Sequence, residues 1–275
     1  MSARRFAPFA VALVSLSLPA CGPGEREIAI DLEARVGTRP FACGGSFDGI
    51  GTTSTTLEAL DLRFYVHDVR VVTAAGEVPV ALSDDGAWQD DGVALIDLED
   101  GCVSGSAPMN TRLVGSVPAD TGAITGVRFR IGVPPERNHL DSSTAPSPLN
   151  LSSMYWGWQA GYKYLRFEGR TTGQPGYLLH VGATGCTGDA TLGTRTCASP
   201  NLADVVVDGF DPATDVLIAD LEALFAGSDL DVNAEGTEPG CMSAPEDPDC
   251  DPIFEALGID GTSQSFFRSE PRPAE

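Results

Sequence analysis

Lysine is almost absent from this 275-residue chain, in which Lys163 is the only one. Arg and Lys together number 17 against 39 Asp and Glu residues, which gives a formal net charge of −22. Such a charge repels nucleic acid and anionic lipid surfaces. We therefore expect no nucleic-acid partner, and a surface suited to solubility or to cationic partners.

Familiar catalytic motifs are also missing. The chain contains no GxSxG elbow, HExxH pair, Walker A loop or GxGxxG in a strand–helix setting. CxxC and CxxCH are absent as well, so neither a thioredoxin-like site nor covalently bound haem is indicated. Acidic runs such as 247–251 are more typical of solvated loops than of calcium ligands. None of these familiar catalytic patterns therefore indicates an enzymatic site.

No apolar run is long enough to cross a bilayer, which takes roughly 20 residues. Arg4 and Arg5 precede an apolar stretch over 6–18, and this pattern predicts an export signal. The stretch ends in Leu18-Pro19-Ala20-Cys21, which is typical of a cysteine that is lipidated after cleavage. We expect residues 1–21 to be a signal peptide ending at Cys21, and the mature chain to be an outer-membrane lipoprotein on the periplasmic side. Plain cleavage to a soluble exported protein is the alternative.

Six cysteines remain after Cys21, and an even number in an exported chain predicts a disulfide framework. Fifteen pairings are possible in principle for six cysteines. The two short loops favour Cys186–Cys197 and Cys241–Cys250, which would leave Cys43 with Cys102.

Short strands dominate the rest of the chain. Residues 27–36 alternate apolar and polar side chains, as in a half-buried strand. Further strands are predicted at 62–72, 93–98, 124–133, 162–168, 177–181 and 203–210. Turn residues separate these runs, and no linker divides them. We therefore predict one mostly β domain over 22–275, a β-sandwich held by disulfides.

Two short helices are predicted near the C-terminus. The first begins after Thr214 as N-cap, with apolar residues at helical spacing as far as Phe225, and ends by Gly227. The second covers 252–257 and stops at Gly258. Residues 269–275 are predicted to be a frayed, disordered tail.

An aromatic stretch at 154–164 holds two of the three tryptophans, Trp156 and Trp158, together with Lys163. Aromatic side chains bury much apolar surface, so a place in the core is the simpler interpretation. A binding site beside a loop is the other. The three histidines are His67 in a strand, His139 in a turn-rich loop and His180 at a strand end.

Several unusual short motifs occur in an order that resembles the MbnP family, the cysteine-rich members of the "metallo-mystery pair" found beside copper-handling genes. The matching motifs run through nearly the whole mature chain: Phe64-Tyr65-Val66, Asp68-Val69-Arg70, Gly132-Val133-Pro134, Asn138-His139, Pro146 to Asn150, Trp156-Gly157-Trp158-Gln159, Gly161-Tyr162-Lys163, His180-Val181-Gly182, Thr184-Gly185-Cys186 and Gly240-Cys241-Met242-Ser243.

The resemblance implies a periplasmic β-sandwich that binds one copper ion, as Cu(I), in copper homeostasis. It also implies that Trp156 is oxidised to kynurenine by a dihaem partner of the cytochrome c peroxidase type, MbnH. His139 and His180 fall at matching histidine positions and are the expected ligands beside the modified Trp156. Where family members often have a polar residue, this chain has His67. This difference from the family either adds a metal ligand or has no effect on the site.

The chemistry of these side chains agrees with that expectation. An indole N–H only donates and offers no lone pair to a metal, whereas kynurenine carries an aniline nitrogen. Two imidazoles and that nitrogen suit copper by ligand type. Met154 and Met242 are soft thioethers that can add a ligand, although methionine is commonly a core residue. Trp158 is a further neighbour of the expected site.

Two other functions are compatible with the sequence. One is a lipoprotein β-sandwich that binds carbohydrate or another ligand on an aromatic platform of Trp156 and Trp158. Exposed, coplanar tryptophans with no histidine nearby would favour it. The other is a copper redox enzyme with the same ligands, for which the sequence offers no general acid or base near the motif.

Overall fold

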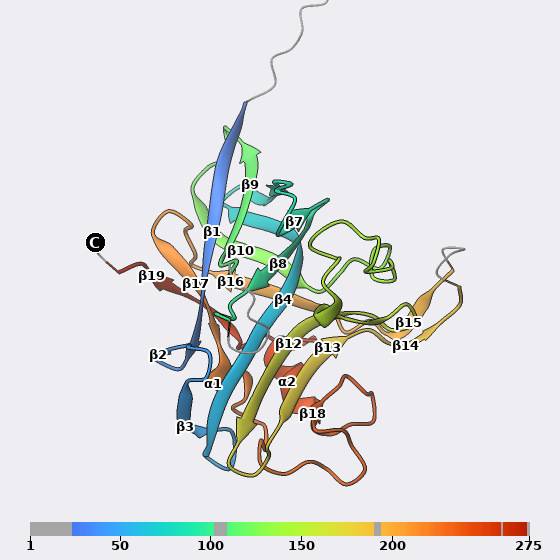
Figure 1. Cartoon of the computed structure of the whole chain (residues 1–275). Helices are drawn as coiled ribbons and strands as arrows, with labels where there is room; N and C mark the ends of the chain where they lie inside the picture. The colour runs from blue at the N-terminus through green and yellow to red at the C-terminus, as the bar shows by residue number, and fades with distance from the viewer. Residues whose placement is uncertain (1–23, 102–108, 190–193, 260, 274–275) are drawn as a thin grey trace, which may run out of the picture.

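The computed structural model describes residues 24–101, 109–189, 194–259 and 261–273, and its strands form two large sheets and a separate hairpin (Figure 1). No helix within these ranges is both long and apolar enough to cross a membrane.

The larger sheet has 11 strands, and its main path runs β16-β10-β4-β12-β13-β18. Its strands are β3 (Ser46–Ile50), β4 (Thr55–Thr73), β5 (Gly76–Pro79), β7 (Gln89–Asp90), β8 (Val93–Asp97), β10 (Ile124–Ile131), β11 (Tyr155–Gly157), β12 (Gly161–Thr171), β13 (Tyr177–Gly182), β16 (Ala203–Asp208) and β18 (Gly240–Cys241). The 19-residue β4 lies at the centre and pairs with β3, β5, β8, β10 and β12.

The smaller sheet has 6 strands in the order β19-β17-β1-β9-β6, with β2 beside β1. These are β1 (Glu25–Val36), β2 (Arg39–Pro40), β6 (Ala81–Leu82), β9 (Arg112–Pro118), β17 (Asp215–Asp220) and β19 (Phe267–Pro271). The hairpin consists of β14 (Thr184–Thr187) and β15 (Thr196–Ser199), and it extends away from the sheets in Figure 1.

One apolar core joins the two large sheets. Phe267 of β19 meets Phe64 of β4 and Phe129 of β10 edge to face, with ring centroids 5.6 and 5.2 Å apart. Alternate residues of β1, Ile28, Ile30 and Leu32, point into the same core. The predicted mostly β sandwich is therefore confirmed, and so are the predicted strands, which coincide with β1, β4, β8, β10, β12, β13 and β16.

The predicted helix over 214–225 is wrong for most of its length. Residues 215–220 form β17, which runs parallel to β1 and antiparallel to β19. All of its residues after Asp215 are buried, so its continuous apolar run imitates a helical pattern. A helix begins only at α1 (Leu221–Leu224), and Asp220, not Thr214, caps it by accepting a 3.0 Å hydrogen bond from the Glu222 N–H.

The second predicted helix is confirmed as α2 (Asp251–Leu257), which ends at Gly258 in the left-handed conformation with φ 75°. The predicted frayed tail is partly wrong, because residues as far as Pro271 belong to β19 and pair with β17. Burial of Phe267 in the core holds this strand in place. Residues 274–275 lie outside the described ranges.

Two of the predicted disulfides are confirmed. Cys186–Cys197 links β14 to β15, and Cys241–Cys250 links β18 to the start of α2. Cys21 and Cys102 lie outside the described residues, so lipidation of Cys21 and the pairing of Cys43 with Cys102 stay predictions.

Charged side chains are buried in the middle of the larger sheet. Asp61 and Arg63 of β4 form an ion pair and are 0% and 1% exposed. Asp97 at the end of β8 is also buried, and its loss of hydration raises its pKa to about 6. The ionised form of Asp97 therefore lowers the stability of the folded state at neutral pH.

We expect Asp97→Asn to raise the free energy of unfolding by about 1–3 kcal/mol at pH 8, because asparagine removes this buried charge. A raised carboxyl pKa destabilises the fold above that pKa, and the cost disappears as the pH falls from about 6 towards 4. The gain should therefore vanish near pH 4. Denaturant unfolding at both pH values checks this, with the exposed Asp208→Asn as control; an equal gain at both pH values would contradict it.

Candidate functional site

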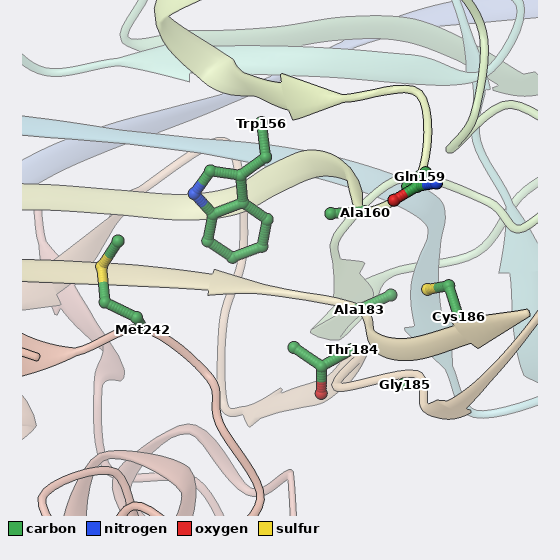
Figure 2. Close-up of a pocket in the computed structure, with 8 residues that line it drawn as sticks. All are labelled: Trp156, Gln159, Ala160, Ala183, Thr184, Gly185, Cys186 and Met242. Atoms are coloured by element: carbon green, nitrogen blue, oxygen red, sulfur yellow. The ribbon is translucent and has the colours of Figure 1, made fainter. Parts of the chain in front are cut away.

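A cavity of about 370 Å³ opens beside the aromatic turn of β11 and β12 (Figure 2). Its lining comes from three places far apart in sequence: Trp156, Gln159 and Ala160 from this turn, Ala183, Thr184, Gly185 and Cys186 from the end of β13 and from β14, and Met242 after β18. Figure 2 shows Met242 and Cys186 on opposite sides of the Trp156 ring.

Trp156 lies against β13 because Gly182 has no side chain. A Cβ built at Gly182 would lie 2.4 Å from Cζ3 of Trp156 and 2.7 Å from the Tyr162 carbonyl oxygen. The indole ring also meets the His180 ring edge to face, with centroids 6.5 Å apart. Gly182 of the His180-Val181-Gly182 motif thus leaves the space that the Trp156 ring occupies.

Gly182→Ala should displace the Trp156 ring and lower the free energy of unfolding by about 1–3 kcal/mol, the usual cost of overpacking. Gly176→Ala is the matched control, since a Cβ there meets nothing within 4 Å. Near-ultraviolet circular dichroism of the tryptophans and denaturant unfolding measure the two effects. Equal behaviour of the two variants would contradict the close contact.

His180 is 4% exposed and held by a carboxylate. Its Nε2 lies 3.0 Å from Oε1 of Glu168. The hydrogen bond from His180, together with Arg166, lowers the pKa of Glu168 to about 2, so Glu168 is ionised and can only accept. Nε2 therefore carries the hydrogen, and the lone pair of the neutral ring belongs to Nδ1.

Nδ1 of His180 is buried and has no hydrogen-bond partner among the described residues. Burial lowers the pKa of His180, which keeps the ring neutral near pH 7. A histidine that donates one N–H to a carboxylate and leaves the other nitrogen with a free lone pair has the arrangement of a metal ligand. The residue therefore fits a metal such as copper.

The half-buried Glu168 belongs to a chain of charges that continues into the buried centre of the sheet. Nη2 of Arg166 lies 2.8 Å from Oε1 of Glu168, and its Nη1 lies 3.0 Å from Oδ2 of Asp61, which also pairs with Arg63. We call Asp61, Arg63, Arg166 and Glu168 the charge network. It connects the sheet centre to His180 and fixes the carboxylate that orients the imidazole.

His139 lies in the loop after β10 and is half-buried. Its Nδ1 donates to the Trp158 carbonyl oxygen at 3.3 Å, and its Nε2 lies 3.5 Å from Sγ of Cys197. Burial lowers its pKa too. Asn138 ties this loop to the sheet by accepting a 3.0 Å hydrogen bond from the Tyr162 N–H.

The structure places the other predicted residues in different surroundings. Met242 lines the cavity, whereas Met154 is fully buried in the core. Trp158 is 57% exposed, with the Arg195 guanidinium 5.0 Å from its ring centroid. His67 is 6% exposed, and its Nδ1 donates to the Gly132 carbonyl oxygen at 2.9 Å, away from the cavity lining.

Lys163 has a structural partner that sequence reasoning did not find. Its Nζ donates to the Ser153 carbonyl oxygen at 3.0 Å, in the 3-10 turn η1 (Ser152–Met154) that leads into β11. Ser243 was also missed: its hydroxyl accepts from the Gly182 N–H and donates to the His180 carbonyl oxygen, both at 3.0 Å. The Gly240–Ser243 motif was the feature of the sequence that could have indicated Ser243.

Comparison with known proteins agrees with this architecture. The MbnP family model matches residues 25–243. The solved structure of MbnP from Methylosinus trichosporium is similar, with a TM-score of 0.81, 31% sequence identity, and coverage of 91% of this chain and 100% of that chain. No curated protein matches the sequence.

Proposed function

The chain belongs to the MbnP family, and on that premise we propose that it is an exported copper-binding protein whose site depends on oxidation of Trp156 to kynurenine. The observation that carries the proposal is the His180 ring next to Trp156: Glu168 holds its Nε2, and its buried Nδ1 has no hydrogen-bond partner among the residues that the structure describes. The chain acts as substrate of a dihaem partner of the MbnH type, and not as an enzyme.

His180, Trp156 in its oxidised form, and His139 would hold one copper ion, as Cu(I). The aniline nitrogen of kynurenine would supply the lone pair that indole lacks. Met242 lines the cavity beside Trp156 and is a soft thioether suited to Cu(I). Copper bound there would serve homeostasis, and a lipid on Cys21 would place it on the periplasmic side of the outer membrane.

The charge network prepares His180 for this task. Glu168 keeps the hydrogen on Nε2 and directs Nδ1 away from itself, while Arg166 keeps Glu168 ionised and in place. Burial lowers the pKa of His180, which favours the neutral ring. The protein therefore presents a neutral imidazole before any metal arrives.

Mass spectrometry and copper analysis of protein from its native host test the proposal. Addition of two oxygens to the indole followed by hydrolytic loss of formate leaves Trp156 with one carbon fewer and one oxygen more than tryptophan. That change, with one copper per chain, is the expected result. Unmodified Trp156 without copper would contradict it.

We expect Glu168→Gln to weaken copper binding by about 10–100-fold, the usual effect of losing the partner of a metal-binding histidine. Competition with a chromogenic Cu(I) chelator measures the affinity. Glu58→Gln is a matched control, because Glu58 also pairs with an arginine, Arg170, on the exposed face of neighbouring strands. Unchanged affinity in Glu168→Gln would remove Glu168 from the site.

The aromatic-platform alternative has less support. Trp156 is half-buried against Gly182 and His180, and Trp158 is exposed under Arg195. The two rings therefore have different partners and exposures. His180 also lies next to the Trp156 ring, whereas a sugar-stacking surface is expected to have no histidine nearby.

A further inference from the structure

A second group of metal-binding side chains lies at the base of the β14–β15 hairpin. Nε2 of His139 and the Sγ atoms of Cys186 and Cys197 all lie within 4.8 Å of one another. No other group of three His, Cys, Asp or Glu residues is this close in the described parts of the chain. His180 does not belong to it.

The imidazole of His139 is oriented toward the two sulfurs. Its Nδ1 donates to the Trp158 carbonyl oxygen, which only accepts, so the lone pair lies on Nε2. That nitrogen is 3.5 Å from Sγ of Cys197. The Asn138 side-chain amide lies at the same distance from Nε2, so this nitrogen has both the disulfide and that amide as neighbours.

The disulfide is the accessible one of the two described. Cys186 and Cys197 are half-buried, and Cys186 lines the open cavity, whereas Cys241 and Cys250 are 0% and 1% exposed. A soluble thiol can reach the first pair directly. The second can be attacked only after the core around it opens.

We propose that the Cys186–Cys197 disulfide masks a second metal site, in which reduction frees two thiolates that bind a thiophilic ion, Zn²⁺ or Cu⁺, together with His139. A dithiol reductant gives up two electrons and two protons and becomes a disulfide. The S–S bond breaks and two thiols form. Binding of the ion then releases both protons and forms two metal–sulfur bonds.

The hairpin suits such a site because Cys186 and Cys197 are directly opposite each other in the register of β14 and β15. Two sulfurs bound to a tetrahedral Zn²⁺ lie about 3.8 Å apart, given Zn–S bonds of about 2.3 Å. We expect rotation of the two freed side chains to provide that separation. Two Cys and one His leave a fourth position for water or another ligand.

The experiment uses the mature chain made without the dihaem partner, so Trp156 is unmodified and the proposed copper site is incomplete. Mild reduction with a dithiol, followed by removal of the reductant without oxygen, should give thiols at Cys186 and Cys197, identified by alkylation and peptide mass spectrometry. Cd²⁺ is the probe, because its thiolate complexes absorb in the ultraviolet. We expect one Cd²⁺ per reduced chain and none per oxidised chain.

This site shares His139 with the proposed copper site, and the cysteine and His180 variants separate the two. Cys186→Ser with Cys197→Ser should abolish Cd²⁺ binding, and His139→Gln should weaken it by at least about tenfold. His180→Gln should leave it unchanged. Zn²⁺ competition against bound Cd²⁺ then confirms that a natural ion occupies the same ligands.

Three results would overturn the inference: thiols at both positions without Cd²⁺ binding, binding that survives the double serine variant, or first reduction at Cys241 and Cys250. Failure of copper binding in the modified protein, with Cd²⁺ binding intact in the reduced one, would count against the proposed function alone.

Discussion

Trp156→Phe, produced together with the dihaem partner, should contain neither kynurenine nor stoichiometric copper. Phenylalanine keeps an aromatic ring next to Gly182 and His180 but has no nitrogen that oxidation can expose. Loss of this ligand should reduce bound copper from one per chain to the background of protein made without the partner. Metal analysis and peptide mass spectrometry of the same preparation measure both effects.

Trp158→Phe is the matched control for this experiment. It lies two residues away, is 57% exposed and contacts Arg195 in place of His180. It should keep both the modification at Trp156 and the copper. Full copper loading in Trp156→Phe, or equal loss in both variants, would show that the nitrogen of Trp156 is not the decisive ligand.

Asp61→Asn should lower the free energy of unfolding by about 3–5 kcal/mol, the usual cost of leaving a buried charge without its partner. Asp61 is fully buried and pairs with both Arg63 and Arg166. Asparagine removes the negative charge and leaves two guanidinium groups inside the larger sheet. Denaturant unfolding with the disulfides intact measures the change.

A surface pair provides the comparison. Asp204→Asn breaks the ion pair with Arg130, whose partners are 68% and 45% exposed, and should cost no more than about 1 kcal/mol. Adding Arg63→Met to Asp61→Asn should recover part of the loss, because it removes one uncompensated charge. A loss of less than about 1 kcal/mol in Asp61→Asn would mean that water reaches the charge network.

Local sequence patterns were sufficient for much of the fold. The alternation in β1 and the bounded apolar runs of β4, β8, β10, β12, β13 and β16 predicted strands, because a side-chain period of two is a property of the backbone itself. The two short-loop disulfides followed from spacing. Gly258 correctly marked the end of α2, since glycine readily adopts the left-handed conformation found there.

The same local reasoning failed where neighbours in space decide the structure. Residues 215–220 became β17 because β1 and β19 provide hydrogen-bonding partners on both sides, a fact absent from the segment itself. The tail after Ser269 is likewise ordered by its pairing with β17. An apolar run satisfies a buried helix and a buried strand equally well, so only tertiary contacts choose between them.

For the candidate site, the sequence by itself proposed the side chains, while the tertiary structure alone decided their surroundings and proton positions. Trp156, His139 and His180 were named from motif words, which record residue type and order. That Nδ1 of His180 is the nitrogen with the free lone pair follows only from Glu168, placed across the sheet by the pairing of β12 with β13. That His139 lies next to a disulfide follows only from the contact between its loop and the β14–β15 hairpin. Proton position and ligand direction depend on partners distant in sequence, and folding alone brings those partners together.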